Sequence, residues 1–241
     1  MDIQTVTFRD LEQMPYKEAW EYQEKLLQAN LDLKKQARDR EMAGEAYAPA
    51  TNHYLLFVEH PAVYTLGKSG DITNVLLTGE QLAEKQIEFF YSNRGGDITF
   101  HGPQQLVGYP ILDLEKYYTD IGRYLRNIEE VMILTMAEYG LIGERSPGET
   151  GVWLDAAIKG RERKIGAIGV RSSRWVTMHG FAFNVNTDLR YFDYIVPCGI
   201  QDKQVTSMEK ELGHPVDMQE IKEKVKANFE KVFQSHLINE V

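Results

Sequence analysis

The chain has 241 residues, 43% hydrophobic and 26% charged, a composition typical of a globular protein with a sizeable buried core. Its net charge of −9 argues against nonspecific nucleic-acid binding. No apolar run approaches the roughly 20 residues that cross a bilayer, no signal segment begins the chain, and its single cysteine excludes an internal disulfide. We therefore expect one cytoplasmic domain over residues 1–241, with no nucleic-acid or membrane partner.

The first predicted element is a helix over residues 16–35, where apolar residues recur at spacings of three and four. Pro15 precedes it, close to the first-turn position that tolerates proline. Residues 37–51 are polar and are expected to form a loop. Three short strands rich in β-branched or aromatic residues are expected next. They cover residues 54–58, 87–91 and 106–112.

A second helix is predicted over residues 120–139, with Gly140 just past its end. A third helix begins near Asp217, whose spacing to Glu220 is that of a capping box. Between these helices, strands are expected at residues 152–154, 164–170, 175–178 and 181–185, with a turn at 159–163. Adjacent strands with separated helices predict an α+β fold, in which helices flank a mixed, largely antiparallel sheet. No glycine-rich loop follows a strand in the way a nucleotide site requires.

Cys198 is the first candidate for chemistry. A lone cysteine is most often a small buried hydrophobe, but Pro197 and Gly199 predict that this one lies in a turn. A thiol of pKa about 8.5 needs a neighbouring cation or base to become a nucleophile at neutral pH. The residues alone leave the partner open. The candidates are His101, His179 and Lys164.

Two glycine-containing segments are candidates for ligand binding. RGGDITFHGP, residues 94–103, combines a tight turn with a short strand, and fits either a simple hairpin or a close approach to a ligand. KIGAIGV, residues 164–170, is a strand interrupted by Gly166 and Gly169. Glycines in a strand mark a bulge or a place where another group lies close, such as a long acyl chain.

Charge is unevenly distributed around the second of these segments. Residues 159–174 contain six cations and one acid in a chain that is acidic overall. Such a stretch is either a solvated hairpin or a docking surface for an acidic partner.

Six segments together resemble the lipoate-protein octanoyltransferase family. They are EHPAVYTLG (59–67), RGGDITFHGP (94–103), GVW (151–153), KIGAIGVR (164–171), HGFAFNV (179–185) and PCGI (197–200). They occur in the family's order over residues 54–200. One position departs from the pattern, because many members have a glycine where this chain has Gln104.

The resemblance implies a single octanoyltransferase domain with the α+β fold of lipoate and biotin protein ligases. It implies that Cys198 carries the acyl group as a thioester, that Lys164 activates it, and that neither a cofactor nor a metal ion takes part. Gly166, Gly169 and Gly180 are then expected to leave room for the acyl chain. The implied substrate-binding residues are Arg94, Gly95, Gly96, Asp97, Ile98, Thr99, Phe100, His101, Ala167, Ile168, Gly169, Gly180, Phe181 and Ala182, with His179 as a further oxyanion or substrate contact.

The resemblance also implies the two partners of the reaction. The expected donor is octanoyl-loaded acyl carrier protein. The expected acceptor is a lysine of the lipoyl domains of 2-oxoacid dehydrogenases or of the glycine cleavage H protein, in the first step of protein lipoylation. Three alternatives remain at this point: an ATP-dependent lipoate or biotin ligase, a hydrolase of acyl thioesters, and a non-catalytic acyl-binding module.

Overall fold

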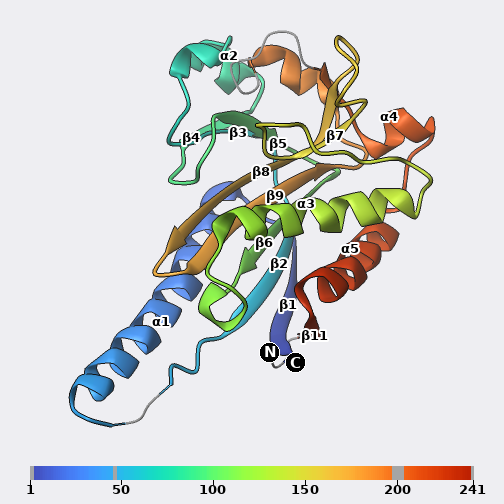
Figure 1. Ribbon diagram of the computed structural model, residues 1–241. Helices are drawn as coiled ribbons and strands as arrows, with labels where there is room; N and C mark the ends of the chain where they lie inside the picture. The colour runs from blue at the N-terminus through green and yellow to red at the C-terminus, as the bar shows by residue number, and fades with distance from the viewer. Residues whose placement is uncertain (1–2, 46–47, 197–203, 240–241) are drawn as a thin grey trace.

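A computed structural model describes residues 3–45, 48–196 and 204–239, which form two sheets and the helices around them (Figure 1). The main sheet has the strand order β10-β8-β9-β6-β2-β1-β11, with β7 paired to β8, and the smaller sheet has the order β4-β3-β5. The strands are β1 (Gln4–Gln13), β2 (His53–Glu59), β3 (Val63–Leu66), β4 (Glu88–Tyr91), β5 (Ile98–His101), β6 (Gln105–Ile111), β7 (Val152–Leu154), β8 (Arg163–Ser173), β9 (Val176–Asn184), β10 (Gln204–Val205) and β11 (Ser235–Asn239). The helices are α1 (Tyr16–Met42), α2 (Gly79–Glu84), α3 (Ile121–Ala137), α4 (Met208–Leu212) and α5 (Met218–Phe233), with short 3₁₀ helices η1 (Ile72–Asn74), η2 (Leu114–Lys116) and η3 (Leu189–Tyr194).

The centre of the main sheet is antiparallel and its margins are parallel. β2 pairs with β6, β6 with β9 and β9 with β8 in antiparallel register. β1 runs parallel to both β2 and β11. The predicted fold class, helices flanking a mixed sheet with an antiparallel centre, is confirmed.

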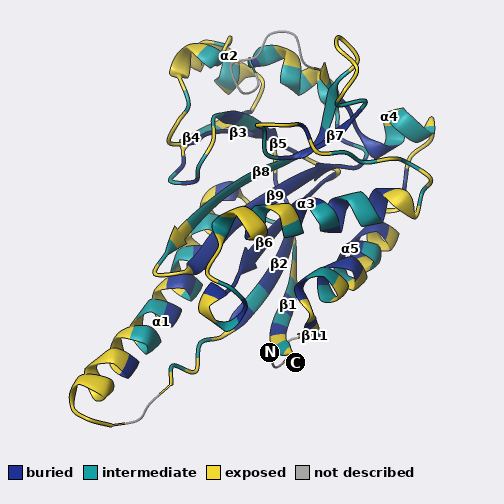
Figure 2. Ribbon diagram, in the orientation of Figure 1, coloured by how far each residue is buried: buried dark blue, intermediate teal, exposed yellow. Residues whose placement is uncertain are grey.

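Helices cover both faces of the main sheet. α3 and α5 pack together on one face and α1 lies on the other (Figure 1). β6 and β9 are buried along their whole length, as the dark blue strands of Figure 2 show. The strands at the centre of the sheet therefore provide a rigid, fully covered platform, and residues at the ends of these strands have fixed positions.

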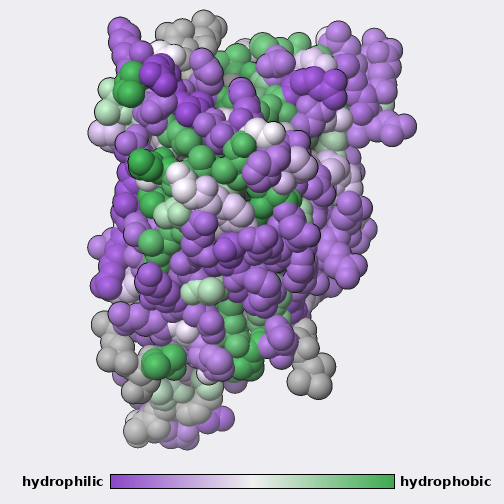
Figure 3. Space-filling view, turned by 90° about the vertical axis from the view of Figure 1, so that its right-hand side faces the viewer, coloured by the Kyte–Doolittle hydropathy of each residue, from purple (hydrophilic) through white to green (hydrophobic). Residues whose placement is uncertain are grey.

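α5 is amphipathic. Asp217 caps it by accepting a hydrogen bond from the backbone N–H of Glu220, which is one half of the predicted capping box, whereas the carboxylate of Glu220 accepts from the hydroxyl of Tyr139. Ile221, Val225 and Phe229 are buried against the core. Figure 3 shows the side of the molecule to which α4 and α5 belong, and hydrophilic side chains cover most of it. Within the described ranges, no helix is long and apolar enough to cross a bilayer.

The prediction of a loop at residues 37–51 was wrong at its start, because α1 continues to Met42. Residues 37–42 consist mostly of good helix formers. Lys34 also fixes this part of the helix to the body by salt bridges to Asp113 and Glu115, at 2.7 and 2.8 Å. The exposed end of α1 extends beyond the sheet (Figure 2).

Two predicted strands, 175–178 and 181–185, are in fact one continuous strand, β9. His179 interrupts its regular geometry with a φ of +58°, in the left-handed region. Its backbone N–H leaves the ladder and donates to Oε1 of Gln23 on α1, 2.8 Å away. The side chain of Gln23 thus provides the acceptor that the backbone N–H of His179 lacks within the sheet. Because Gln23 lies far away in the sequence, no local pattern predicted this irregularity.

Candidate active site

A cavity of 460 Å³ opens where β8, β9 and β6 face the turn before β5. This volume lies within the usual range for small-molecule sites, about 300–1,000 Å³. Much of its wall is apolar. Six of the apolar residues are Val107, Ile165, Ile168, Phe181, Phe192 and Val205.

Most of the residues singled out in the sequence lie on this one cavity. They are Arg94, Gly96, Asp97, Ile98, Thr99, His101, Lys164, Ala167, Ile168, Gly169, His179, Gly180, Phe181 and Ala182. Gly95 and Phe100 are not among the lining residues: Gly95 donates its N–H to the carbonyl of Val170, and Phe100 stacks on Tyr191 with ring centroids 4.6 Å apart. Cys198 lies outside the described residues.

Lys164 lies on β8, between β7 on one side and β10 on the other. Its Nζ is 4.6 Å from the centroid of the Trp153 ring, in a cation–π contact. A Cβ on Gly151 would lie 3.1 Å from Cε of Lys164, and its φ of +129° also favours glycine. The GVW segment therefore forms a wall along the lysine side chain.

Arg94 is buried and braces the turn that contains it. Its NH2 group donates to the carbonyls of Thr65 at 2.6 Å and Asp97 at 2.8 Å, and its NH1 group donates to the carbonyl of Gly95 at 2.9 Å. These bonds to backbone oxygens hold the turn of residues 94–97 against β3. Arg94 thus shapes the cavity wall and places a positive charge beside it.

Three histidines lie at or beside the cavity: His101 and His179 line it, and the ring centroid of His60 is 5.8 Å from that of His101. Burial lowers the pKa of all three, to about 4 for His60 and about 3 for His179, and well below the ordinary value for His101. The positive charge of Arg94 adds to the effect on His101 and His179. All three rings are therefore neutral at physiological pH.

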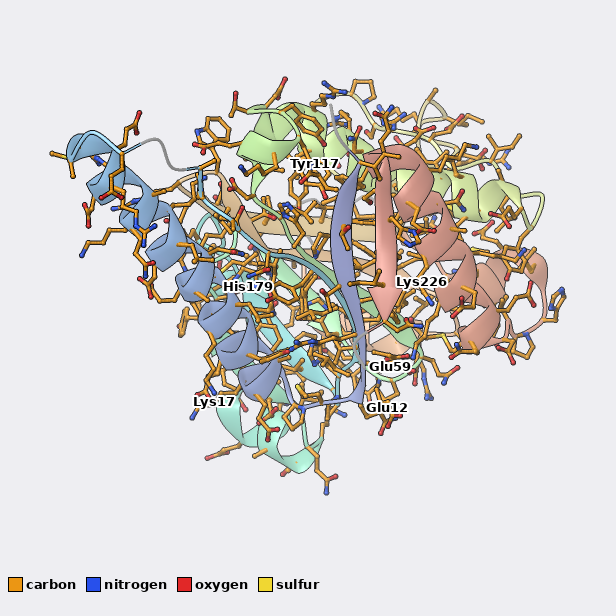
Figure 4. The ribbon with its side chains drawn as sticks, turned by 90° about the horizontal axis from the view of Figure 1, so that it is seen from below. Glu12, Lys17, Glu59, Tyr117, His179 and Lys226 are labelled. Carbon is orange, nitrogen blue, oxygen red and sulfur yellow. The ribbon has the colours of Figure 1, made fainter. Side chains whose placement is uncertain are left out.

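His179 is held by an amide from the turn before Arg94. In Figure 4 it lies between α1 and the strands of the main sheet. Its Nε2 is 2.6 Å from Oδ1 of Asn93, whose amide nitrogen donates to the carboxylate of Glu24 at 2.8 Å. Because the carboxylate fixes the orientation of the amide, Nε2 of His179 carries the hydrogen and donates it to Asn93. Neither this N–H nor the backbone N–H of His179 is then available to stabilise an oxyanion.

Glycines bring the strands around the cavity close together. Gly169 and Gly180 face each other in the register of β8 and β9. A Cβ on Gly180 would lie 2.1 Å from the carbonyl oxygen of Gly108, and one on Gly169 would lie 2.9 Å from that of Gly95. These glycines are required for close backbone packing, in addition to any room they leave for a ligand.

Comparison with known proteins identifies the family. Residues 15–230 match the lipoyl protein ligase A/B catalytic domain. The octanoyltransferase of Christiangramia forsetii is 54% identical over 96% of this chain and 97% of its own, and that of Flavobacterium johnsoniae is 56% identical over 97% and 98%. The chain therefore belongs to the octanoyltransferases of the lipoyl protein ligase A/B family.

The fold agrees with this assignment. A bipartite lipoate protein ligase from Thermoplasma acidophilum superimposes with a TM-score of 0.65 at 16% identity, over 98% of this chain and 87% of that one. At this identity the likeness shows the fold alone. The expectation of an acyltransferase of the lipoate-protein octanoyltransferase family with a lipoate ligase-like fold is confirmed.

The departure at Gln104 has a structural explanation. Gln104 has a φ of +61°, in the region that favours glycine, which is the residue expected there from the family resemblance. The chain keeps this conformation because the N–H of Gln104 donates to the carboxylate of Glu59 at 2.8 Å and its carbonyl accepts from the N–H of Asn186 at 3.0 Å. The substitution therefore strains the turn without changing the cavity wall, which Gln104 does not line.

The basic stretch at residues 159–174 is partly neutralised within the molecule. Arg163 pairs with Glu211 and Asp155, and Arg171 pairs with Glu24 at 2.8 Å. These pairs favour the interpretation of a solvated hairpin over that of a docking surface.

Several cavity residues were not identified from the sequence. They are Tyr16, Gln105, Tyr109, Asn184 and Phe192. They come from α1, β6, β9 and η3, so only the tertiary fold brings them together. Among the described residues, no group of three or more His, Cys, Asp or Glu side chains is arranged to bind a metal ion.

Proposed function

We propose that this protein transfers an octanoyl group from an acyl thioester on a carrier protein to a lysine of a lipoyl-domain protein. The observation that supports this best is the apolar cavity with Lys164 on its wall, in a chain similar over almost its full length to octanoyltransferases. The proposal includes Cys198 as the residue that carries the acyl group between the two partners.

The placement of the neighbouring strand supports a Cys198–Lys164 pair. The described chain resumes at β10, which runs parallel to β8 with Val205 opposite Lys164. The N–H of Thr206 donates to the carbonyl of Lys164 at 2.9 Å. Cys198 precedes this point by a few residues of sequence. We propose that the ammonium or amine of Lys164 lies close enough to favour the thiolate.

The reaction then proceeds in two steps. The thiolate of Cys198 attacks the carbonyl carbon of the carrier thioester, a C–S bond to the enzyme forms, and the carrier leaves as a thiol. The lysine amine of the acceptor attacks the enzyme thioester, the amide forms, and the Cys198 thiol is regenerated. Because a thioester is less stable than an amide, the transfer needs no ATP, and the covalent intermediate predicts ping-pong kinetics.

The cavity provides the binding energy for the acyl chain. Each buried CH₂ contributes about 0.8 kcal/mol, so burial of an octanoyl tail supplies about 5 kcal/mol before ordering costs. Ile168 and Phe181 lie opposite each other on β8 and β9 and line this space.

The finer assignments follow from the same proposal. We propose octanoyl-acyl carrier protein as donor, and lipoyl domains of 2-oxoacid dehydrogenases and the glycine cleavage H protein as acceptors. Residues 1–241 act as one catalytic domain. A thiol nucleophile must stay reduced, which supports a cytoplasmic location.

The test is transfer from octanoyl-carrier protein to a lipoyl domain in the absence of ATP. Wild-type protein should form the octanoylated domain, and Lys164→Met should reduce the rate by at least about a hundredfold. Lys159→Met, an exposed lysine on the same hairpin, serves as the matched control and should retain the wild-type rate. A wild-type protein that requires ATP would instead indicate a ligase, and release of free octanoate at the transfer rate would indicate a hydrolase.

A further inference from the structure

One ring nitrogen of His101 has its protonation fixed by neighbouring amides. Nδ1 of His101 lies 2.8 Å from Oε1 of Gln105. The amide nitrogen of Gln105 donates to the carbonyl of Phe100 at 3.1 Å and to Oδ1 of Asn184 at 2.9 Å. Because a carbonyl oxygen only accepts, the bond to Phe100 determines which end of the Gln105 amide is the NH₂ group. The other end, Oε1, faces His101, so Nδ1 of His101 carries the hydrogen.

The orientation of Asn184 is determined in the same way. Its amide nitrogen donates to the carbonyl of Thr206 at 3.0 Å, which leaves Oδ1 as the acceptor for Gln105. Thr206 in turn donates its N–H to the carbonyl of Lys164. A continuous line of hydrogen bonds therefore connects the His101 ring to the backbone of the strand that bears Lys164.

Nε2 of His101 is left with its lone pair. His101 is only 7% exposed and lines the cavity, and no residue of the described ranges donates a hydrogen bond to Nε2. Burial, together with His60 and Arg94, lowers the pKa of the ring, so that it stays neutral. A neutral ring in this tautomer accepts a hydrogen bond at Nε2 and offers none to an oxyanion.

We infer that Gln105 and Asn184 are positioning residues that hold His101 as its Nδ1–H tautomer, so that Nε2 accepts a hydrogen bond from the attacking amino group of the acceptor lysine. This inference rests on the proposed function, since it assigns a hydrogen-bond acceptor to the acceptor lysine, the second substrate of that reaction. The attacking amine is neutral: its lone pair attacks the acyl carbon, and one of its two N–H groups can be donated to the unprotonated ring nitrogen. The attacking nitrogen bonds to the acyl carbon, the C–S bond breaks, and the leaving sulfur takes the proton that the amine loses.

The tautomer is measured directly with ¹⁵N-labelled histidine and long-range ¹H–¹⁵N correlation spectra of the whole protein. Wild-type His101 should show a protonated Nδ1 and an unprotonated Nε2. Gln105→Leu removes the acceptor for Nδ1–H, and a form protonated on Nε2 should then appear. Gln28→Leu, an exposed glutamine on α1 that pairs only with Asp32 among the described residues, is the matched control and should leave the spectrum unchanged. A wild-type hydrogen on Nε2 would overturn the inference.

The role of His101 in binding the acceptor amine is measured as the ratio of two rates for the octanoyl enzyme, transfer to a lipoyl domain and hydrolysis by water. Gln105→Leu should lower the ratio of transfer to hydrolysis by about tenfold, the effect of one lost hydrogen bond. An unchanged ratio in a folded Gln105→Leu protein would contradict the inference.

Gln105→Glu separates positioning from a merely structural role. The carboxylate oxygen that faces His101 still accepts from Nδ1–H, but the other oxygen cannot replace the hydrogen bonds donated to Phe100 and Asn184, so the ratio should recover in part at high pH. The same carboxylate raises the pKa of His101, so the ratio should fall on acidification over a range in which the wild type is constant. If the leucine and glutamate variants lose transfer equally at every pH, Gln105 is only structural and the inference fails. If Gln105→Leu does not fold, the wild-type spectrum and the glutamate pH profile decide.

The two proposals fail in different ways. A wild-type protein that transfers no octanoyl group rejects the proposed function. A fully active wild-type protein whose His101 carries its hydrogen on Nε2 rejects this inference alone.

Discussion

The buried carboxylate of Glu129 accepts a hydrogen bond from the backbone N–H of Gly151 at 3.0 Å. Glu129 lies on α3 with no exposed side-chain surface, and it also binds Arg126 and Arg145 at 2.7 and 2.9 Å. Gly151 in turn packs against the side chain of Lys164. A charge in the helix layer thus fixes the wall beside the lysine that we propose to be catalytic.

Removal of the Glu129 carboxylate should destabilise the protein and loosen the GVW segment that packs along the side chain of Lys164. In Glu129→Ala the arginines can rehydrate, since they are 44% and 37% exposed, but the N–H of Gly151 loses its partner. We expect a loss of about 2 kcal/mol in the free energy of unfolding, measured by urea titration, together with a lower transfer rate. Glu130→Ala, which removes a partly exposed partner of Arg145, should cost less than about 0.5 kcal/mol. Equal losses in the two variants would contradict this role.

Gly180→Ala tests the close approach of β9 to β6. The added methyl would lie 2.1 Å from the carbonyl oxygen of Gly108, where the sheet must open to accept it. We expect a loss of about 2 kcal/mol or more in the free energy of unfolding. The control is Gly79→Ala on α2, where a Cβ meets no atom within 4 Å, and which should be neutral or slightly stabilising. A stable Gly180→Ala protein would show that the sheet is less closely packed than described.

Acid should destabilise the protein through its buried histidines. Burial lowers the pKa of His53 and His60 from 6.5 to about 4 and that of His179 to about 3. Because the unfolded chain binds more protons below pH 6.5, the stability from these neutral rings is complete above that pH and is lost as the pH falls toward the folded values. Each ring contributes up to about 1.4 kcal/mol per pH unit in this range.

Urea titrations at pH 7 and pH 5 measure this dependence. The free energy of unfolding should be several kcal/mol lower at pH 5. His60→Gln removes one of these groups, and its loss of stability between the two pH values should be smaller. A free energy that is constant between pH 7 and pH 5 would show that the rings are not held neutral by the fold.

Ala167→Leu tests the cavity as the acyl site. Ala167 lines the cavity opposite Ala182, so a leucine there takes up space needed by a long tail. In the wild type, two fewer CH₂ groups cost about 1.6 kcal/mol, so octanoyl should exceed hexanoyl donors about 15-fold in kcat/KM. The variant should reduce or invert this preference, whereas Ala83→Leu, exposed on α2, should preserve it. The same preference in both variants would place the acyl chain elsewhere.

The sequence predicted elements that depend on local pattern. The helix capped by Asp217 follows from nearby residues. α3 ends at Ala137, two residues before the predicted end, and Gly140 lies in the turn after it with a φ of +76°. β1 and β11 were missed, because each is stabilised by the other from the opposite end of the chain. Strands of this kind have no turn signal to mark their pairing.

The candidate site divides in the same way. Motif residues such as Lys164 and His101 were found from the sequence and lie on one cavity. The residues that set the states of the histidines, Gln105 and Asn93, act through contacts between different elements. These contacts form only in the folded protein, so the spacing of residues along the chain does not predict them.

The most direct test of the proposed mechanism is the intact mass of the protein after mixing with octanoyl-carrier protein in the absence of acceptor. The wild type should gain the mass of one octanoyl group, and a lipoyl domain added afterwards should remove it. Cys198→Ala should gain no mass and transfer nothing, since no sulfur remains to carry the acyl group. Transfer at the wild-type rate by Cys198→Ala, or a wild-type protein that turns over without ever showing the added mass, would contradict the covalent mechanism.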